Sequence, residues 1–196
     1  LDAEEVLYCG MITGKKVLHG QHQFRSDFLP HESFVMGARD VMGAGETVEI
    51  DFPEARLEAR SGSTASGTVS FAPAGGKVRV EARLSGLTPG AHGFHVHEVG
   101  DCSAADAASA KGHFNPAGKT HGHQSGEHHA GDMPNLDADA NGNASLVVEV
   151  EQMAIVEGPG GIVGRSVVVH ADPDDYKSQP AGNSGKRVAC GVIRMR

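Results

Sequence analysis

Histidine dominates the residue types that could do chemistry in this chain. Twelve of the 196 residues are histidine, and eight of them lie between His92 and His129. Surface histidines are usually scattered along a sequence, so this crowding indicates metal binding before any motif is considered.

The pair His95 and His97 has the spacing of two neighbours on one face of a strand. Residues two apart in a strand point the same way and lie about 6.6 Å apart along the chain. Both imidazoles could therefore bind one metal, while Phe94 and Val96 face the core. Such a pair is a weak signal by itself, because exposed strand histidines also occur by chance.

A third strand histidine extends this pair. His170 ends the aliphatic run 167–169, and with His95, His97 and His113 it would complete a site of four imidazoles. Four nitrogen ligands are typical of the tetragonal sites that Cu(II) prefers.

A second group of ligand types lies between His113 and Asp132. Together with His121 and His129, these residues offer three imidazoles and one carboxylate, a set that suits tetrahedral zinc. Zinc has no redox chemistry, and four protein ligands leave no position for a water nucleophile, so hydrolysis is disfavoured. His113 belongs to both groups, and a deprotonated imidazole would serve two metals through its two nitrogens.

Two more histidines of this segment, His123 and His128, leave the ligand set open. His128 could compete with its neighbour His129, and a role for His123 in metal binding stays undecided. His92 is interpreted as a turn residue.

Strands must position these residues. Residues 77–84 alternate apolar and charged side chains, which predicts a strand with one buried face. Segments with the same character lie at 68–71, 94–97, 145–150, 166–170 and 188–193. No helical periodicity accompanies them, so we predict an all-β antiparallel sandwich or barrel.

Two long connections interrupt the predicted strands, at 98–136 and 171–187. Loops of this length are usually functional or disordered. The first holds five of the twelve histidines, which favours function.

The segment 137–142, just after the first of these connections, has the sequence of the first half of a calcium-binding loop. The glutamate that such a loop requires at its twelfth position is missing, so we interpret the segment as a hairpin turn.

Residues 55–196 resemble the copper,zinc superoxide dismutases over their whole length. The resemblance is carried by Gly-Leu-Thr-Pro-Gly-Ala-His-Gly-Phe-His-Val-His-Glu (86–98), Gly-Asp-Cys (100–102), His-Phe-Asn-Pro (113–116), His-Ala-Gly-Asp (129–132), Val-Val-His (168–170) and the segment 182–193. It implies a Greek-key antiparallel β-sandwich or flattened barrel with two long functional loops. It also implies an enzyme in which a redox-cycling copper, next to a structural zinc, disproportionates superoxide to dioxygen and hydrogen peroxide.

The resemblance further assigns roles to individual residues. It implies copper at His95, His97, His113 and His170, and zinc at His113, His121, His129 and Asp132. Asp174 matches the carboxylate that orients one histidine of each metal, and Arg187 matches the arginine that guides and holds the anion. His113 would also donate a proton. Cys102 and Cys190 match the disulfide of the family.

Composition limits partners and compartment. The net charge of −8 without a basic stripe argues against nucleic acid, and no run approaches the roughly 20 apolar residues of a membrane span. We expect superoxide as the substrate, and a homodimer is compatible with the resemblance. A disulfide and this family favour a periplasmic or secreted protein. The chain starts at Leu1 without Met, so we expect it to be processed or trimmed.

Residues 1–54 have a different character, with 10 acidic and 4 basic side chains. We interpret them as an extension of unknown role that packs on the domain or on a partner. Its methionines and His19, His22 and His31 make a copper-capturing segment the alternative. An edge strand at 48–52 is predicted, and whether Cys9 is free stays open.

Two other classes of function compete with the enzyme. A copper carrier without turnover would be expected to lack Arg187 or a copper ligand, and a copper-only dismutase would lack the zinc ligands. Neither departure is found in this sequence.

Overall fold

The computed structural model describes residues 51–196, and this part of the chain contains nine strands and one short 3-10 helix. In chain order they are β1 (Glu54–Ala59), β2 (Ser66–Ala74), β3 (Lys77–Ser85), β4 (Gly90–His92), β5 (Phe94–His97), η2 (Ala108–Ala110), β6 (Leu136–Ala138), β7 (Ala144–Val150), β8 (Ser166–His170) and β9 (Arg187–Arg194).

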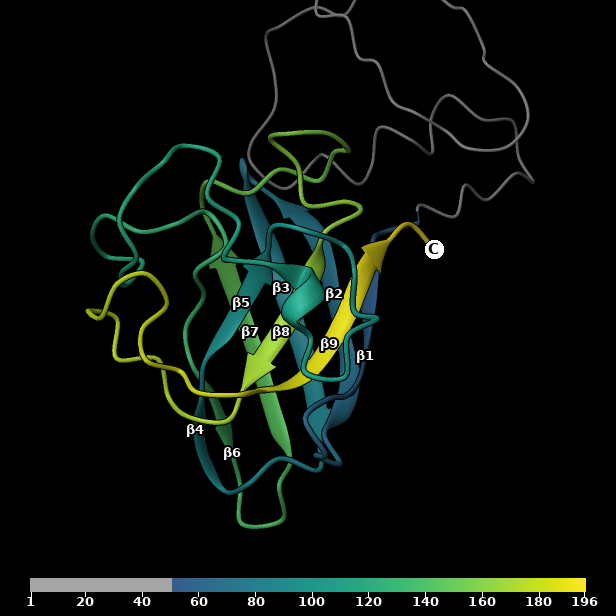
Figure 1. Ribbon diagram of the computed structural model, residues 1–196. Coiled ribbons are helices and arrows are strands. Elements are labelled where there is room, and N and C mark those ends of the chain that lie inside the picture. The colour runs from purple at the N-terminus through teal and green to yellow at the C-terminus, as the bar shows by residue number, and fades with distance from the viewer. Residues whose placement is uncertain (1–50) are drawn as a thin grey trace, which may run out of the picture. The chain divides into compact units, whose positions relative to one another are not determined.

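All strand pairings are antiparallel, in the order β4-β6-β7-β3-β2-β1-β9-β8-β5. The two strands at the ends of this order, β4 and β5, are separated in the chain only by Gly93. The sheet therefore curls until its ends meet, and Figure 1 shows the resulting barrel-like shape. The pairing of β1 with β9 and of β5 with β8 gives the non-sequential neighbours of a Greek key, which confirms the predicted fold class.

The side-chain pattern explains the strands that the sequence predicted. In β3, Val78, Val80, Ala82 and Leu84 are buried and alternate with exposed or half-buried residues, as a strand with one face on the core requires. The predicted strands at 94–97 and 166–170 are confirmed as β5 and β8 with the same bounds.

Three strands were not predicted: β1, β4 and β6. Two of them are only three residues long, and the burial of β1 alternates only over residues 55–58. Of the predicted edge strand at 48–52, residues 48–50 lie outside the described residues, and Asp51 and Phe52 precede β1 without joining a strand. Cys9 and the histidines before residue 51 also lie outside them.

Two long connections lie between the strands, as predicted. We call residues 98–135, between β5 and β6, the first loop, and residues 171–186, between β8 and β9, the second loop. Of the segment 137–142, Asp137 and Ala138 end β6, and the rest lies in the turn of the β6–β7 hairpin, where Gly142 N donates to Asp139 O at 2.9 Å.

Candidate metal centre

Strands β5 and β8 place three histidines next to one another. Phe94 pairs with Val169 and His97 with Ser166, so the two strands run side by side over their length. Phe94 and Val96 belong to the hydrophobic core, which directs His95 and His97 to the opposite face. His170 ends β8, and its backbone N–H donates to Gly93 O at 2.8 Å.

The first loop crosses β5 and adds ligand types to this face. Phe114 N donates to Val96 O at 2.8 Å, and Val96 N donates to Gly131 O at 2.9 Å. These bonds place His113 opposite His97 and Asp132 opposite His95. Because the loop covers it, the histidine face of β5 is as buried as its core face.

The first group that results is the four-histidine cluster, with one ring nitrogen of each member within 4.8 Å of the others. Its members are His95, His97, His113 and His170. The ring nitrogens that face away from the cluster are held by other groups: His97 Nδ1 lies 2.9 Å from Lys111 O, and His95 Nε2 lies 2.7 Å from Asp174 Oδ2.

The second group is the mixed cluster, formed by His113, His121, His129 and Asp132 within the same distance limit. His113 Nδ1 lies 2.8 Å from Asp132 Oδ1. His121 Nδ1 lies 2.9 Å and His129 Nδ1 3.4 Å from an oxygen of the same carboxylate, yet neither forms a hydrogen bond. His113 thus belongs to both clusters, through opposite nitrogens.

Four buried ring nitrogens have no hydrogen-bond partner among the described residues, and all of them point into the two clusters. They are His95 Nδ1, His113 Nε2, His121 Nδ1 and His129 Nδ1. Buried polar atoms without a partner are rare and destabilising. A metal ion in each cluster would satisfy them. The donors fit the expected metals, since four imidazoles suit copper, and three imidazoles with a carboxylate suit zinc.

Charge in the four-histidine cluster is kept low by burial. Burial lowers the pKa of His95 to about 4, and it lowers the pKa values of His97 and His170 well below their usual range. These rings are therefore neutral at pH 7, the form that binds a metal.

The mixed cluster has the opposite character, because two buried carboxylates face its histidines. Although burial opposes it, the hydrogen bond to His113 and the close contact with His121 hold the pKa of Asp132 far below its usual range. Burial also opposes ionisation of Asp174, but its contacts with His121 and His95 lower the pKa of this carboxyl as well. Against the effect of burial, the two carboxylates raise the pKa of His121 to about 9.

Asp174 connects the two clusters. Its Oδ2 lies 2.7 Å from His95 Nε2, and its Oδ1 lies 2.9 Å from His121 Nε2. Asn135 holds the backbone of Asp174 from both sides, accepting from its N–H at 2.9 Å and donating to its C=O at 3.0 Å. Sequence reasoning missed Asn135, since a side-chain amide that binds a backbone has no signature in residue type or spacing.

Arg187 lies at the start of β9, beside the four-histidine cluster. Its guanidinium donates to Ala107 O at 2.7 Å and to Lys111 O at 2.6 Å. The second of these carbonyls also contacts His97 Nδ1, so the cation and a histidine of the cluster share one anchor in the first loop.

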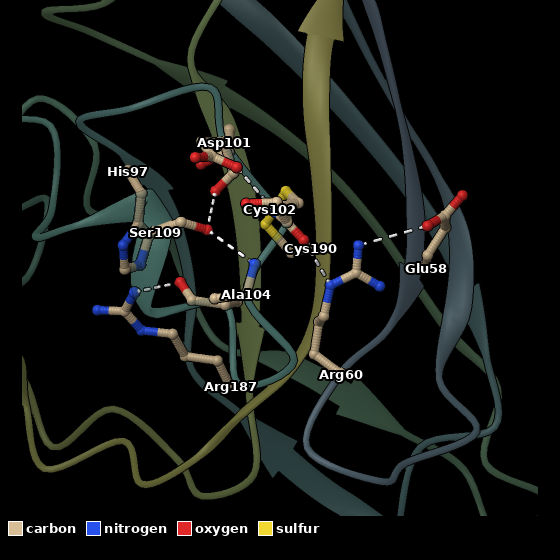
Figure 2. Close-up of a disulfide and its surroundings, with 12 residues drawn as sticks. Glu58, Arg60, His97, Asp101, Cys102, Ala104, Ser109, Arg187 and Cys190 are labelled. Atoms are coloured by element: carbon tan, nitrogen blue, oxygen red, sulfur yellow. Dashed lines mark hydrogen bonds and ion pairs between the residues drawn. A yellow bond between two sulfur atoms is a disulfide. The ribbon is translucent and has the colours of Figure 1, made fainter.

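A disulfide ties that stretch of the first loop to the sheet. Cys102 is bonded to Cys190 of β9, with their Cα atoms 5.7 Å apart. Figure 2 shows Arg187 and His97 on one side of the bridge and Arg60 on the other. Arg60 Nε donates to Cys102 O at 2.9 Å. The loop that anchors Arg187 is thus fixed at the bridge.

The remaining histidines of the described residues lie outside both clusters. His128 is buried, but its Nδ1 contacts Gly126 O at 2.7 Å and its Nε2 accepts from Gln152 Nε2 at 3.0 Å. His123 is exposed and contacts Ser125. The interpretation of His92 as a turn residue was wrong: it ends β4, is buried, and its ring contacts His170 O at 2.7 Å.

Comparison with known proteins gives one consistent result. The sequence model of the family described as copper/zinc superoxide dismutase (SODC) matches residues 65–193. The chain is 37% identical over 191 residues to "Superoxide dismutase [Cu-Zn] 2" of Aquifex aeolicus (strain VF5), a match that covers 94% of this chain and 97% of that protein. It is 42% identical over 146 residues to "Superoxide dismutase [Cu-Zn]" of Onchocerca volvulus, covering 68% and 91%.

The chain is also similar to a solved structure. The crystal structure of a protein described as the clock protein EA4 matches with a TM-score of 0.67 at 40% identity. The match covers 79% of this chain and all of that chain.

Proposed function

We propose what each residue of the two clusters does, from the premise that this chain belongs to the copper/zinc superoxide dismutase family. It is an enzyme that uses copper and zinc to disproportionate superoxide: two superoxide ions and two protons give one dioxygen and one hydrogen peroxide. The roles of individual residues in that reaction are our proposal.

His95, His97, His113 and His170 are the proposed copper ligands. Their support is the burial of all four rings and the two unpartnered nitrogens, His95 Nδ1 and His113 Nε2, that point into the cluster. Copper bound there would supply the redox chemistry of the reaction, the transfer of an electron from one superoxide ion to another.

His113, His121, His129 and Asp132 are the proposed zinc ligands. Asp174 orients one ring of each set, because its two oxygens contact His95 and His121. Zinc is redox-inert, so the mixed cluster would hold His113 in position.

Arg187 is the proposed substrate-binding residue. A guanidinium attracts an anion and donates hydrogen bonds to it on arrival. The carbonyls of Ala107 and Lys111 hold this side chain next to His97. His113 is the proposed proton carrier: in one half of the reaction Nε2 would leave the copper and take up a proton, and in the other half it would give that proton to the reduced substrate and bind copper again. The second proton would come from solvent.

One observation carries this assignment: a single imidazole, His113, belongs to both clusters through opposite nitrogens. The test is metal content together with dismutase activity, before and after chelation. We expect about one copper and one zinc per chain and activity that copper restores. A chain that binds one metal in total, with full activity, would contradict the shared histidine.

Residues 55–196 are the proposed catalytic domain, and residues 1–54 an extension that packs on the domain or on a partner. Every proposed ligand lies after residue 94, which supports this division. The Aquifex match covers 94% of the chain, a share that it reaches only by extending well into the segment before residue 54. A protein lacking residues 1–46 should keep both metals and its activity. A folded, fully loaded but inactive product would contradict the division.

The protein is proposed to act in the periplasm or outside the cell, a location that the Cys102–Cys190 disulfide favours. Among residues 51–196, no helix is long and apolar enough to cross a membrane. Fractionation of the producing cell tests the location, and activity confined to the cytosol would contradict it.

A homodimer is the proposed assembly, and light scattering of the full chain tests it.

A further inference from the structure

One exposed side chain of the second loop holds the backbone of a mixed-cluster residue from both sides. Gln179 Oε1 accepts a hydrogen bond from His121 N at 2.9 Å, and Gln179 Nε2 donates to His121 O at 2.8 Å. The two residues are 58 positions apart in the chain. The amide therefore satisfies both backbone polar groups of His121.

The backbone N–H and C=O of His121 have no other hydrogen-bond partner among the described residues. His113 and Asp132 lie where the first loop is bonded to β5, as the bonds of Phe114 and Gly131 with Val96 show. His121 makes no backbone–backbone hydrogen bond, although it is buried. Within the described residues, Gln179 is the only hydrogen-bond partner of the His121 backbone, while the N–H of the next residue, Gly122, donates to Asp132 Oδ2 at 3.2 Å.

The second loop is built to present this side chain. Asp175 Oδ1 accepts from the backbone N–H groups of Lys177 and Ser178 at 2.8 and 2.7 Å, and Gly182 N donates to Ser178 O at 2.7 Å. These bonds form a small closed turn that holds Gln179 over the first loop.

A glycine lets this turn approach the cluster closely. Gly182 has a φ of +65°, and a Cβ there would collide with Asp174 Oδ1 and lie 2.7 Å from His121 Nε2. The backbone of the second loop thus packs directly over the contact between Asp174 and His121.

We propose that Gln179 is a positioning residue for zinc: it fixes the backbone of His121 so that Nδ1 points into the mixed cluster. This inference rests on the proposed assignment of His121 as a zinc ligand. It makes zinc retention a property of both loops, because the ligand is held at its ring by Asp174 and at its backbone by Gln179.

The test replaces Gln179 with Met, which keeps the length of the side chain but neither accepts nor donates these hydrogen bonds. The position is exposed, so the variant should fold. Zinc release from the copper- and zinc-loaded protein to a coloured chelator should be about tenfold faster, since partners that orient metal ligands are typically worth 10–100-fold in affinity. Copper release should not change.

A spectroscopic measurement separates positioning from a general loss of stability. Co²⁺ in place of zinc absorbs visible light according to the geometry of its ligands, so a displaced His121 should change the Co²⁺ spectrum of Gln179→Met. Ser178→Ala is the matched control. It removes a hydrogen bond to Asp175 within the same turn, at 2.6 Å, that reaches no proposed ligand. Its zinc release and Co²⁺ spectrum should equal those of the wild type.

A third variant, His121→Ala, tells two failures apart. Zinc retained in His121→Ala would overturn the proposed ligand set. Zinc lost from His121→Ala but released at the wild-type rate from Gln179→Met, with an unchanged Co²⁺ spectrum, would overturn only the role of Gln179. Equal acceleration in Ser178→Ala would overturn it too, because any disturbance of the loop would then have the same effect.

Discussion

Three of the four members of the four-histidine cluster lie on β5 or β8, whereas all four members of the mixed cluster lie in the first loop. The register of β5 with β8 places His95 and His97. The mixed cluster instead depends on a few bonds of the first loop to β5 and on side chains of the second loop, Asp174 and Gln179.

This difference separates two ways of building a metal site in one molecule. A site on paired strands has the stability of the sheet, since moving a ligand requires breaking the pairing. A site on loops is stable only while the contacts between the loops persist. Copper binding should therefore be sensitive to few positions beyond its ligands, and zinc binding to many.

The largest expected effect is the selective loss of one metal when a member of a single cluster is removed. His95→Ala should abolish copper binding and activity, because it removes a proposed ligand that the strand holds in place. Asp132→Ala should abolish zinc binding, since its carboxylate faces all three histidines of the mixed cluster. Elemental analysis of both variants checks this. Loss of both metals from each variant would contradict two separately built sites.

A smaller effect, unequal for the two metals, is expected when Asp174, which contacts one histidine of each cluster, is changed. Asp174→Asn keeps the size of the side chain but loses the charge that faces His121 and His95. Zinc affinity should fall about 10–100-fold. Copper affinity should fall less, because β5 still holds His95. Competition titrations with a chelator measure both constants.

Asp172→Asn is the matched control for this change. Asp172 lies in the same loop, is exposed, and its carboxylate makes no hydrogen bond to another described residue. Its metal affinities should equal those of the wild type. An equal fall for copper and zinc in Asp174→Asn would show that the strand gives His95 no advantage.

Arg187 offers a change that should affect turnover and neither metal. Arg187→Lys keeps the positive charge but loses the planar fork, so the loss of rate should be modest. Arg187→Glu should slow the reaction at least tenfold, since electrostatic steering is worth 10–10³ in association rate. Arg56→Glu is the control, because it makes the same change of net charge at an exposed position of β1.

Pulse radiolysis at several salt concentrations measures these rates. The wild-type rate should fall with added salt, and less steeply in Arg187→Ala, because screening weakens an attraction that the variant lacks. Full activity of Arg187→Glu at low salt would mean that the anion reaches copper by another route.

The same contrast between strands and loops explains what could be predicted from the sequence. Strands with a periodic pattern, such as β3, were predicted nearly to the residue. The three-residue strands β4 and β6 were not, because a segment so short has no period. The burial of both faces of β5 was not predicted either, since the first loop that covers it is placed by non-local contacts.

Candidate site residues could be predicted from the sequence where the side chain itself is the proposed metal ligand or the charged group. His121, Asp132 and Arg187 have residue types that suit a metal or an anion, and the family resemblance placed them in order. Asn135 and Gln179 act through amides that bind backbone groups, and many surface residues have the same type. Only the packing of one loop on the other distinguishes them.

The smallest expected effect concerns His128, which sequence reasoning left as a rival to His129. His128 is buried within the first loop, but its ring contacts Gly126 O and Gln152, and Lys119 Nζ donates to Gln152 Oε1 at 2.6 Å. This chain of contacts ties the outer side of the loop to the segment after β7 and reaches no proposed ligand. His129→Ala should therefore abolish zinc binding, whereas His128→Ala should weaken it by less than about tenfold, because the two hydrogen bonds that it removes end on no proposed ligand.

Zinc titration of the two variants decides between the neighbours, and the reverse result would exchange their roles. The outcome also sharpens the contrast between strands and loops. If His128→Ala releases zinc as fast as Gln179→Met, then any contact of the first loop supports the metal equally. If it does not, only the contacts that end on a ligand count, and the loop-built site is held at a few specific points rather than by the loop as a whole.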